Sequence, residues 1–122
     1  MNWIAVAIGG AMGSLARHGV NALFARMTEA TTPYATATVN ILGSVVIGVL
    51  AGLTAGGKLH MTSTMRAFVF VGILGGFTTF SSFMLDTLTL TRGGQTPLAV
   101  ANIAAQLALG AIAVFAGYAA AR

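Results

Sequence analysis

The chain has 122 residues, of which 57% are hydrophobic and only 7% are charged, whereas a soluble domain carries about 25% charged residues. This composition excludes a soluble globular protein, and the absence of cysteine excludes a disulfide framework and a thiolate metal site. The net charge of +4 comes from scattered basic residues that form no patch, so we expect lipid headgroups and not nucleic acid as their partners.

Four apolar stretches follow one another, at residues 3–24, 35–55, 67–90 and 97–121. Each is close to the ~20 residues that a helix needs to cross ~30 Å of hydrocarbon. The connections are short, which predicts a single domain over residues 1–122, an all-α integral membrane protein with four transmembrane helices. The first stretch lacks a basic flank and a small-residue cleavage site, so we expect a membrane helix and not a signal peptide.

The first two stretches carry small or polar residues at every fourth position. These residues are Ala5, Gly9, Gly13 and Arg17 in the first stretch, and Thr36, Asn40, Ser44, Gly48 and Gly52 in the second. Small residues on one stripe let helix backbones approach closely inside a membrane. We interpret the glycines as packing seams without a chemical role.

The third stretch is irregular near its middle, where the run Gly75, Gly76, Phe77, Thr78, Thr79, Phe80 interrupts it. Glycine tolerates non-helical dihedrals, and Thr and Ser hydroxyls compete with helix hydrogen bonds. The run therefore indicates either a kinked helix or a true break. Unwound backbone at membrane depth persists only where protein buries it or where it lines a cavity, and there its free carbonyls can coordinate a cation.

Two phenylalanines follow the interruption, and Phe80 and Phe83 share one helix face because they lie three residues apart. Thr79, Ser82 and Asp86 fall on an adjoining face. The ordinary interpretation of such a Phe pair is packing or lipid contact.

The fourth stretch places Asn102, Gln106 and Gly110 on one face. Two amides at this spacing fit two interpretations equally well. They are either hydrogen-bonding contacts between helices or a polar track that lines a pathway.

Basic residues are nearly balanced between the two sides of a four-helix topology. Lys58, Arg66 and Arg122 fall on one side, and Arg26, Arg92 and the nearby Arg17 fall on the other. An excess of Lys and Arg on the cytoplasmic side normally sets the orientation of a membrane protein. With almost no excess, the sequence allows insertion in both orientations.

Catalytic clusters are missing from the sequence, whose only acids are Glu29 and Asp86 and whose histidines, His18 and His60, lie far apart. An enzyme is therefore not expected. The remaining chemistry is a path of neutral donors and aromatic ring edges, which can bind a small anion weakly enough to release it. The donors are the amide of Asn40 and the hydroxyls of Thr36, Thr79 and Ser82.

Arg17 can raise the local anion concentration at the mouth of such a path. Pairing with Asp86 or anchoring at the headgroups is the commoner fate of an arginine in this position.

The run GILGGFTTFSSF (72–83) resembles the signature of the CrcB/Fluc fluoride channels. The similarity continues at TATVNILGSVVIG (36–48), GGAMGSLAR (9–17) and NIAAQLALGAIAVFAGY (102–118). It therefore extends over all four expected helices.

The resemblance implies a dual-topology, antiparallel homodimer in the bacterial inner membrane, with helix three broken near its middle. Cytoplasmic fluoride would leave the cell passively through two pores, which lowers its toxicity. A structural sodium ion at the dimer centre would be held by the backbone carbonyls of Gly75 and Thr78.

The same resemblance implies the residues of the fluoride pathway. These are Asn40, Phe80, Phe83, Thr36, Asn102 and Gln106, with Arg17 at the pore mouth, and the hydroxyl donors Thr79 and Ser82 complete the predicted pathway. The chain departs from the family pattern at His18, Ala35, Asp86 and Gln106. The departure at Gln106 has the largest consequence, because a longer amide replaces the usual serine.

A second hypothesis is a small multidrug-type, proton-coupled exporter, which also forms four-helix dual-topology dimers. Such exporters need a carboxylate in helix one, whereas residues 3–24 contain no acid and Asp86 lies near a helix end. A third hypothesis is a structural subunit without transport, in which the polar residues serve only packing.

Overall fold

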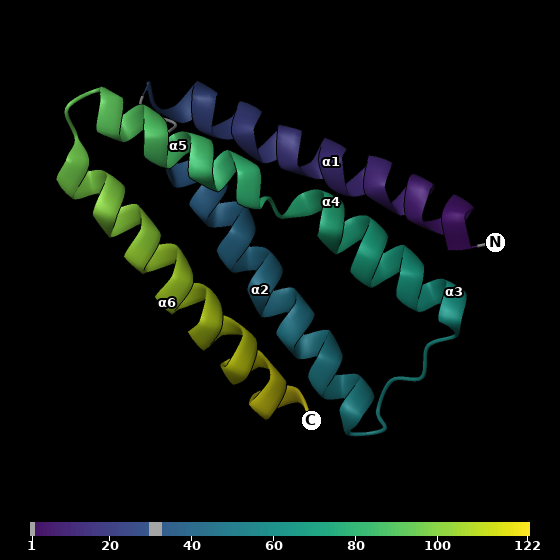
Figure 1. The fold of residues 1–122 in the computed structure, drawn as a ribbon. Helices are drawn as coiled ribbons and strands as arrows, with labels where there is room; N and C mark the ends of the chain where they lie inside the picture. Colours follow the sequence, from purple (N-terminus) through teal and green to yellow (C-terminus); the bar gives the residue numbers. More distant parts are fainter. Residues whose placement is uncertain (1, 30–32) are drawn as a thin grey trace.

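The computed structural model describes residues 2–29 and 33–122, which contain helices and no strand. Its elements are α1 (Asn2–Met27), α2 (Tyr34–Ala55), α3 (Ser63–Arg66), η1 (Ala67–Leu74), α4 (Gly75–Phe77), α5 (Phe80–Arg92) and α6 (Thr96–Ala121). The elements from α3 to α5 follow one another along one line and form the third helical stretch, which lies between α2 and α6 in the chain (Figure 1). Residues 3–24, 35–55 and 97–121 lie within α1, α2 and α6, whereas residues 67–90 span η1, α4 and α5 with the non-helical residues 78–79 between them.

Three of the helical stretches are long and apolar enough to cross a membrane, namely Tyr34–Ala55, Ser63–Arg92 and Thr96–Ala121. Helix α1 has 26 residues, but polar side chains, among them Arg17 and Asn21, lower the hydropathy of its second half. An all-helical fold with three such helices is that of an integral membrane protein.

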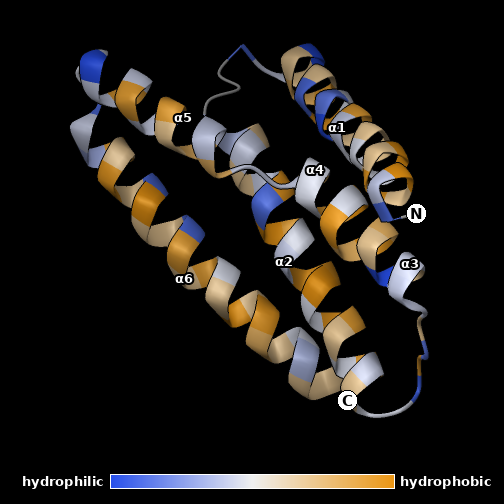
Figure 2. Cartoon of the chain, turned by 45° about the vertical axis from the view of Figure 1, so that its right-hand side comes forward, coloured by the Kyte–Doolittle hydropathy of each residue, from blue (hydrophilic) through white to orange (hydrophobic). Residues whose placement is uncertain are grey.

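Burial in the described residues differs from that in a soluble protein, because many large apolar side chains are exposed. Large apolar side chains such as Trp3 and Phe115 are 88% and 75% exposed. The side chains of Thr36, Asn102 and Gln106 are buried. Figure 2 shows hydrophobic residues along most of α2 and α6, interrupted by short hydrophilic segments. The apolar surface faces lipid, and polar groups lie between the helices.

Glycine seams hold the helices in two pairs. A Cβ added to Gly9 of α1 would lie 2.5 Å from the backbone oxygen of Phe68 in η1. A Cβ added to Gly48 of α2 would lie 2.5 Å from the backbone oxygen of Val114 in α6. Because no Cβ fits at these distances, the predicted packing seams are confirmed.

The third helical stretch breaks at Thr78 and Thr79, whose backbones are extended, with ψ angles of 159° and 123°. The predicted break is confirmed, and the structure separates its two expected contributors, the glycines and the hydroxyl residues. Gly75 is helical, with φ of −63° and ψ of −36°. Gly76 is needed for close packing, because an added Cβ would lie 2.7 Å from the oxygen of Gly10. The threonines, not the glycines, leave the helix.

The turns before the break form a π-helix over Ala67–Leu74. π-Helices are rare, and those that occur often lie at functional sites. Their wider turn shifts the residues that follow. Nothing in the sequence pattern predicted it.

The α2–α6 seam provides a stability test. We expect Gly48→Ala to lower the free energy of unfolding by about 1–3 kcal/mol, the usual cost of forcing extra volume into packed helices. Denaturation of the purified protein with SDS, followed by circular dichroism, measures this change. Gly110→Ala is the matched control, because its Cβ would meet only the Ser44 hydroxyl at 3.6 Å. Equal stability of the two variants would contradict the tight seam.

Candidate functional site

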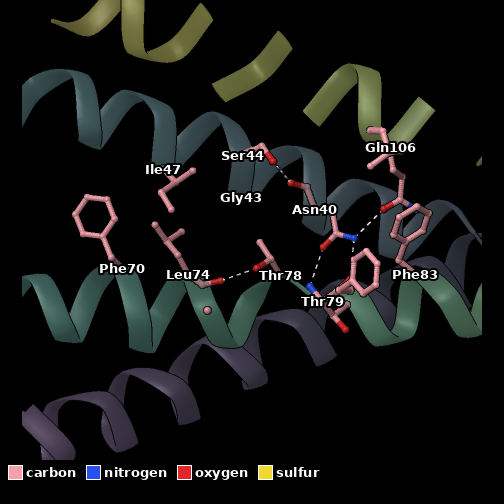
Figure 3. Close-up of a pocket in the computed structure, with 13 residues that line it drawn as sticks. Asn40, Gly43, Ser44, Ile47, Phe70, Leu74, Thr78, Thr79, Phe83 and Gln106 are labelled. Carbon is pink, nitrogen blue, oxygen red and sulfur yellow. Dashed lines mark hydrogen bonds between the residues drawn. The ribbon is translucent and has the colours of Figure 1, made fainter. Parts of the chain in front are cut away.

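A cavity of about 400 Å³ lies beside the helix break, between α2, α6 and the third helical stretch. Its lining comprises Asn40, Gly43, Ser44, Ile47, Phe70, Leu74, Gly75, Thr78, Thr79, Phe80, Phe83, Gln106 and Leu107. None of these lining residues is charged. Figure 3 shows Asn40 and Gln106 approaching the break from α2 and α6.

Asn40 bonds to both backbone groups of Thr79. Its Oδ1 accepts from the Thr79 N–H at 2.8 Å, and its Nδ2 donates to the Thr79 carbonyl at 3.0 Å (Figure 3). Helix α2 thereby replaces the hydrogen bonds that the extended residue cannot make within its own helix. This pair of bonds, the Asn40–Thr79 clamp, stabilises the break inside the protein.

Asn40 also begins a chain of side-chain hydrogen bonds. Its Nδ2 donates to Gln106 Oε1 at 2.7 Å, and Gln106 Nε2 donates to Asn102 Oδ1 at 2.8 Å. Asn102 Nδ2 then donates to the Thr87 hydroxyl at 3.2 Å, which donates to the Phe83 carbonyl at 2.9 Å. The predicted polar residues of α2 and α6 therefore form one connected track.

Two backbone carbonyls at the break lose their helical donors. The Thr79 N–H, which would bond to the Gly75 carbonyl in a continuous helix, donates to Asn40. The Ser82 N–H, which would bond to the Thr78 carbonyl, donates to Thr79 Oγ1 at 3.2 Å and so caps α5. The break thus diverts the donors of the two carbonyls, those of Gly75 and Thr78, that the family resemblance assigned to a sodium ion.

The rings of Phe80 and Phe83 contact each other edge to face, with centroids 5.8 Å apart and an interplanar angle of 89°. Phe83 is buried, whereas Phe80 is 70% exposed although it lines the cavity. The predicted shared face is confirmed. The cavity is therefore open to the surface of the chain at Phe80.

A polar cavity of about 260 Å³ lies on the other side of the break, lined by Ser14, Arg17, His18, Asn21, Thr36, Thr79 and Ser82. Thr79 lines both cavities, and a neighbouring hollow extends from Thr36 and Ser82 to Asp86. Within residues 2–29 and 33–122, Arg17 makes no ion pair with Asp86. Arg17 therefore faces a polar vestibule, and the roles assigned to these residues remain predictions.

Several residues of the site were missed in the sequence. Thr87 ends the hydrogen-bonded track, and Ser14 and Asn21 join Arg17 in the vestibule. Ser14, Arg17 and Asn21 recur at helical spacing, which could have identified that face. Thr87 had no such signal, because its partner Asn102 lies on another helix.

These features define a helical membrane protein with an uncharged polar track beside a broken helix. The chain belongs to the family described as CrcB-like protein, Camphor Resistance (CrcB), whose model matches residues 4–118.

Its relatives include three proteins named fluoride-specific ion channel FluC. The protein from Opitutus terrae is 44% identical over 120 residues, which cover 98% of this chain and 91% of the relative. That from Agrobacterium fabrum is 44% identical over 98% of this chain and 94% of the relative. That from Thermus thermophilus is 43% identical over 95% and 91%.

The family membership and the three apolar helices establish a multi-pass bacterial membrane protein. The relatives' names describe ion channels and not enzymes, as the sequence predicted. They give no support to the exporter hypothesis.

The Asn40–Thr79 clamp provides a test of the site. We expect Asn40→Ala to remove both clamp bonds, and because each contributes about 1 kcal/mol, the Thr79 amide proton should exchange with solvent faster by tenfold or more. Hydrogen exchange followed by NMR measures this rate. Ser44→Ala is the control, since that hydroxyl donates to the Asn40 carbonyl within α2. Slow exchange at Thr79 in Asn40→Ala would show that other contacts hold the break.

Proposed function

We propose that the chain is a fluoride-selective channel that lets cytoplasmic fluoride leave the cell passively and so lowers its toxicity. The observation that carries the proposal is the meeting of a neutral amide, Asn40, with the Phe80–Phe83 pair at a helix break. The names of the relatives support fluoride as the ion.

The chemistry of the cavity suits a small, strongly hydrated anion. Amide and hydroxyl protons replace water as donors, and the edges of aromatic rings carry positive potential. The edge-to-face contact covers one ring face and leaves the outer ring edges to the ion. Because the lining is uncharged, the ion is bound without the deep trap that a buried lysine would create.

Arg17 acts at the pore mouth in this proposal. It faces the vestibule with the hydroxyls of Thr36 and Ser82, and its charge raises the anion concentration there. Thr79 then passes the ion from the vestibule to the cavity, since it lines both. Asn102 and Gln106 continue the path along α6.

Helix α1 is the fourth transmembrane helix in this proposal, and residues 1–122 form a single membrane domain. The packing of α1 against η1 and α4 supports this assignment, because Gly9 and Gly13 bring the backbones into close approach. The vestibule, whose lining comes from α1, α2 and α5, also gives the polar side chains of α1 a protein-lined environment in the membrane.

The functional unit in the proposal is an antiparallel homodimer in the bacterial inner membrane. The near balance of basic residues favours insertion in both orientations. Phe80 is 70% exposed at the open wall of the cavity, where a second copy would complete the lining.

A structural sodium ion at the dimer centre fits the donors that the break provides. The carbonyls of Gly75 and Thr78 have lost their helical donors to Asn40 and to Thr79 Oγ1. Free carbonyls of a broken membrane helix are suitable sodium ligands, and two copies of the chain would supply four of them. When bound, sodium would be coordinated by these carbonyl oxygens and would link the two copies of the chain.

Fluoride efflux from liposomes tests the function. Vesicles containing the purified protein should release fluoride and retain chloride, and Phe80→Ile or Phe83→Ile should abolish release by removing the aromatic wall. Phe115→Ile is the matched control, because Phe115 is 75% exposed on α6 away from the cavity. Equal release of both ions, or of neither, would contradict the proposed function.

Single-cysteine labelling tests the dual topology. The chain has no cysteine, so His60→Cys in the exposed loop after α2 provides one label. An impermeant maleimide applied to intact spheroplasts should modify about half of the molecules, because near-balanced loop charges favour neither orientation. Disrupting the membrane should then expose the remainder. Complete labelling or complete protection in intact spheroplasts would show a single orientation.

A further inference from the structure

The hydrogen-bonded track has a direction that leaves Asn40 without a free amide proton. One Nδ2 proton of Asn40 bonds to the Thr79 carbonyl and the other to Gln106 Oε1. An amide nitrogen has two protons. An anion that uses Asn40 without opening the Asn40–Thr79 clamp must therefore take the Asn40 proton that now bonds to Gln106 Oε1.

Gln106 is fixed at both ends in this arrangement. It is 7% exposed, its Oε1 faces Asn40, and its Nε2 donates to Asn102 Oδ1, whose residue is 5% exposed. In this arrangement Gln106 Oε1 accepts from Asn40 Nδ2, and its negative partial charge would repel an anion at Asn40. A side chain that only packed helices together would keep this orientation permanently.

The same track can be reversed, with the anion replacing Gln106 Oε1 as the acceptor for Asn40 Nδ2. If the amides of Gln106 and Asn102 both rotate by about 180°, Gln106 Nε2 faces Asn40 and Asn102 Nδ2 donates to Gln106 Oε1. The Thr87 hydroxyl then donates to Asn102 Oδ1 in place of the Phe83 carbonyl. That carbonyl lies inside α5 and keeps its helical donor.

We infer that Gln106 is a switchable anion ligand: its oxygen satisfies Asn40 when the cavity is empty, and its amide nitrogen donates to the ion when one arrives. Asn102 and Thr87 allow the switch because each can reverse its own hydrogen bond. This inference rests on the proposed function and adds a specificity-determining residue to it. A bound anion receives two amide donors, from Asn40 and from Gln106.

Side-chain NMR tests the switch directly in the unmodified protein. The side-chain NH₂ groups of ¹⁵N-labelled protein in detergent are titrated with sodium fluoride, with sodium chloride as the control. We expect saturable shifts at both the Asn40 and the Gln106 amide protons with fluoride, and none with chloride. A response of Asn40 without one of Gln106, or equal responses to both salts, would overturn the inference.

Fluoride efflux provides the second measurement. Gln106→Met keeps the length of the side chain but removes its donor, and loss of one hydrogen bond to a charged ion should slow efflux at low fluoride by about tenfold or more. Ile112→Met, at a 62% exposed position of the same helix, should leave efflux unchanged.

The two proposals fail in different ways. If the unmodified protein releases no fluoride, the proposed function is wrong. If it releases fluoride while Gln106→Met is equally fast, or while the Gln106 amide does not respond to fluoride, the channel stands and the switch is wrong.

Discussion

The structure depends on satisfying the backbone of one extended residue inside a membrane. Lipid offers no hydrogen bonds, so an unpaired N–H or C=O there costs several kcal/mol. Asn40 bonds to both groups of Thr79, and the rest of the site follows from that clamp. It allows α5 to start anew at Phe80 with Thr79 as its cap. It releases the Gly75 carbonyl from the helix and places the phenylalanines next to the amide.

The glycine seams bring the clamp into range. Lipid gives helices no hydrophobic reason to associate, so close backbone contact and interhelical hydrogen bonds must hold them. A Cβ on Gly43 would collide with the methyl group of Thr78. Because Gly43 has no side chain, the broken segment can pack directly against α2. Gly48 likewise brings α6 close enough for Gln106 to reach Asn40. Helix α2 therefore carries both the glycines that bring the helices close together and the Asn40 amide that stabilises the break.

Sequence reasoning identified what is local. Apolar runs located the helices, and hydroxyls among glycines located the break, because both are expressed within about twenty residues of chain. It named the glycines and the hydroxyl residues together as the cause of the break, whereas Gly75 remains helical and Thr78 and Thr79 are extended. It also left open whether Asn102 and Gln106 were packing contacts or a track. The structure shows that these amides bond to Asn40 and Thr87 on other helices, and no spacing within one helix encodes such partners.

An uncharged track must solve a problem that a charged one avoids. A buried donor ready for an anion is unsatisfied whenever the anion is absent, and that costs about 1–3 kcal/mol. A fixed acceptor would remove the cost but would compete with the ion permanently. An amide resolves the conflict because it carries an acceptor and a donor on one rotatable group. Serine can do the same over a shorter reach, but from α6 it would need the helices closer together. At the spacing that Gly48 sets, glutamine is long enough to span the gap between α6 and Asn40.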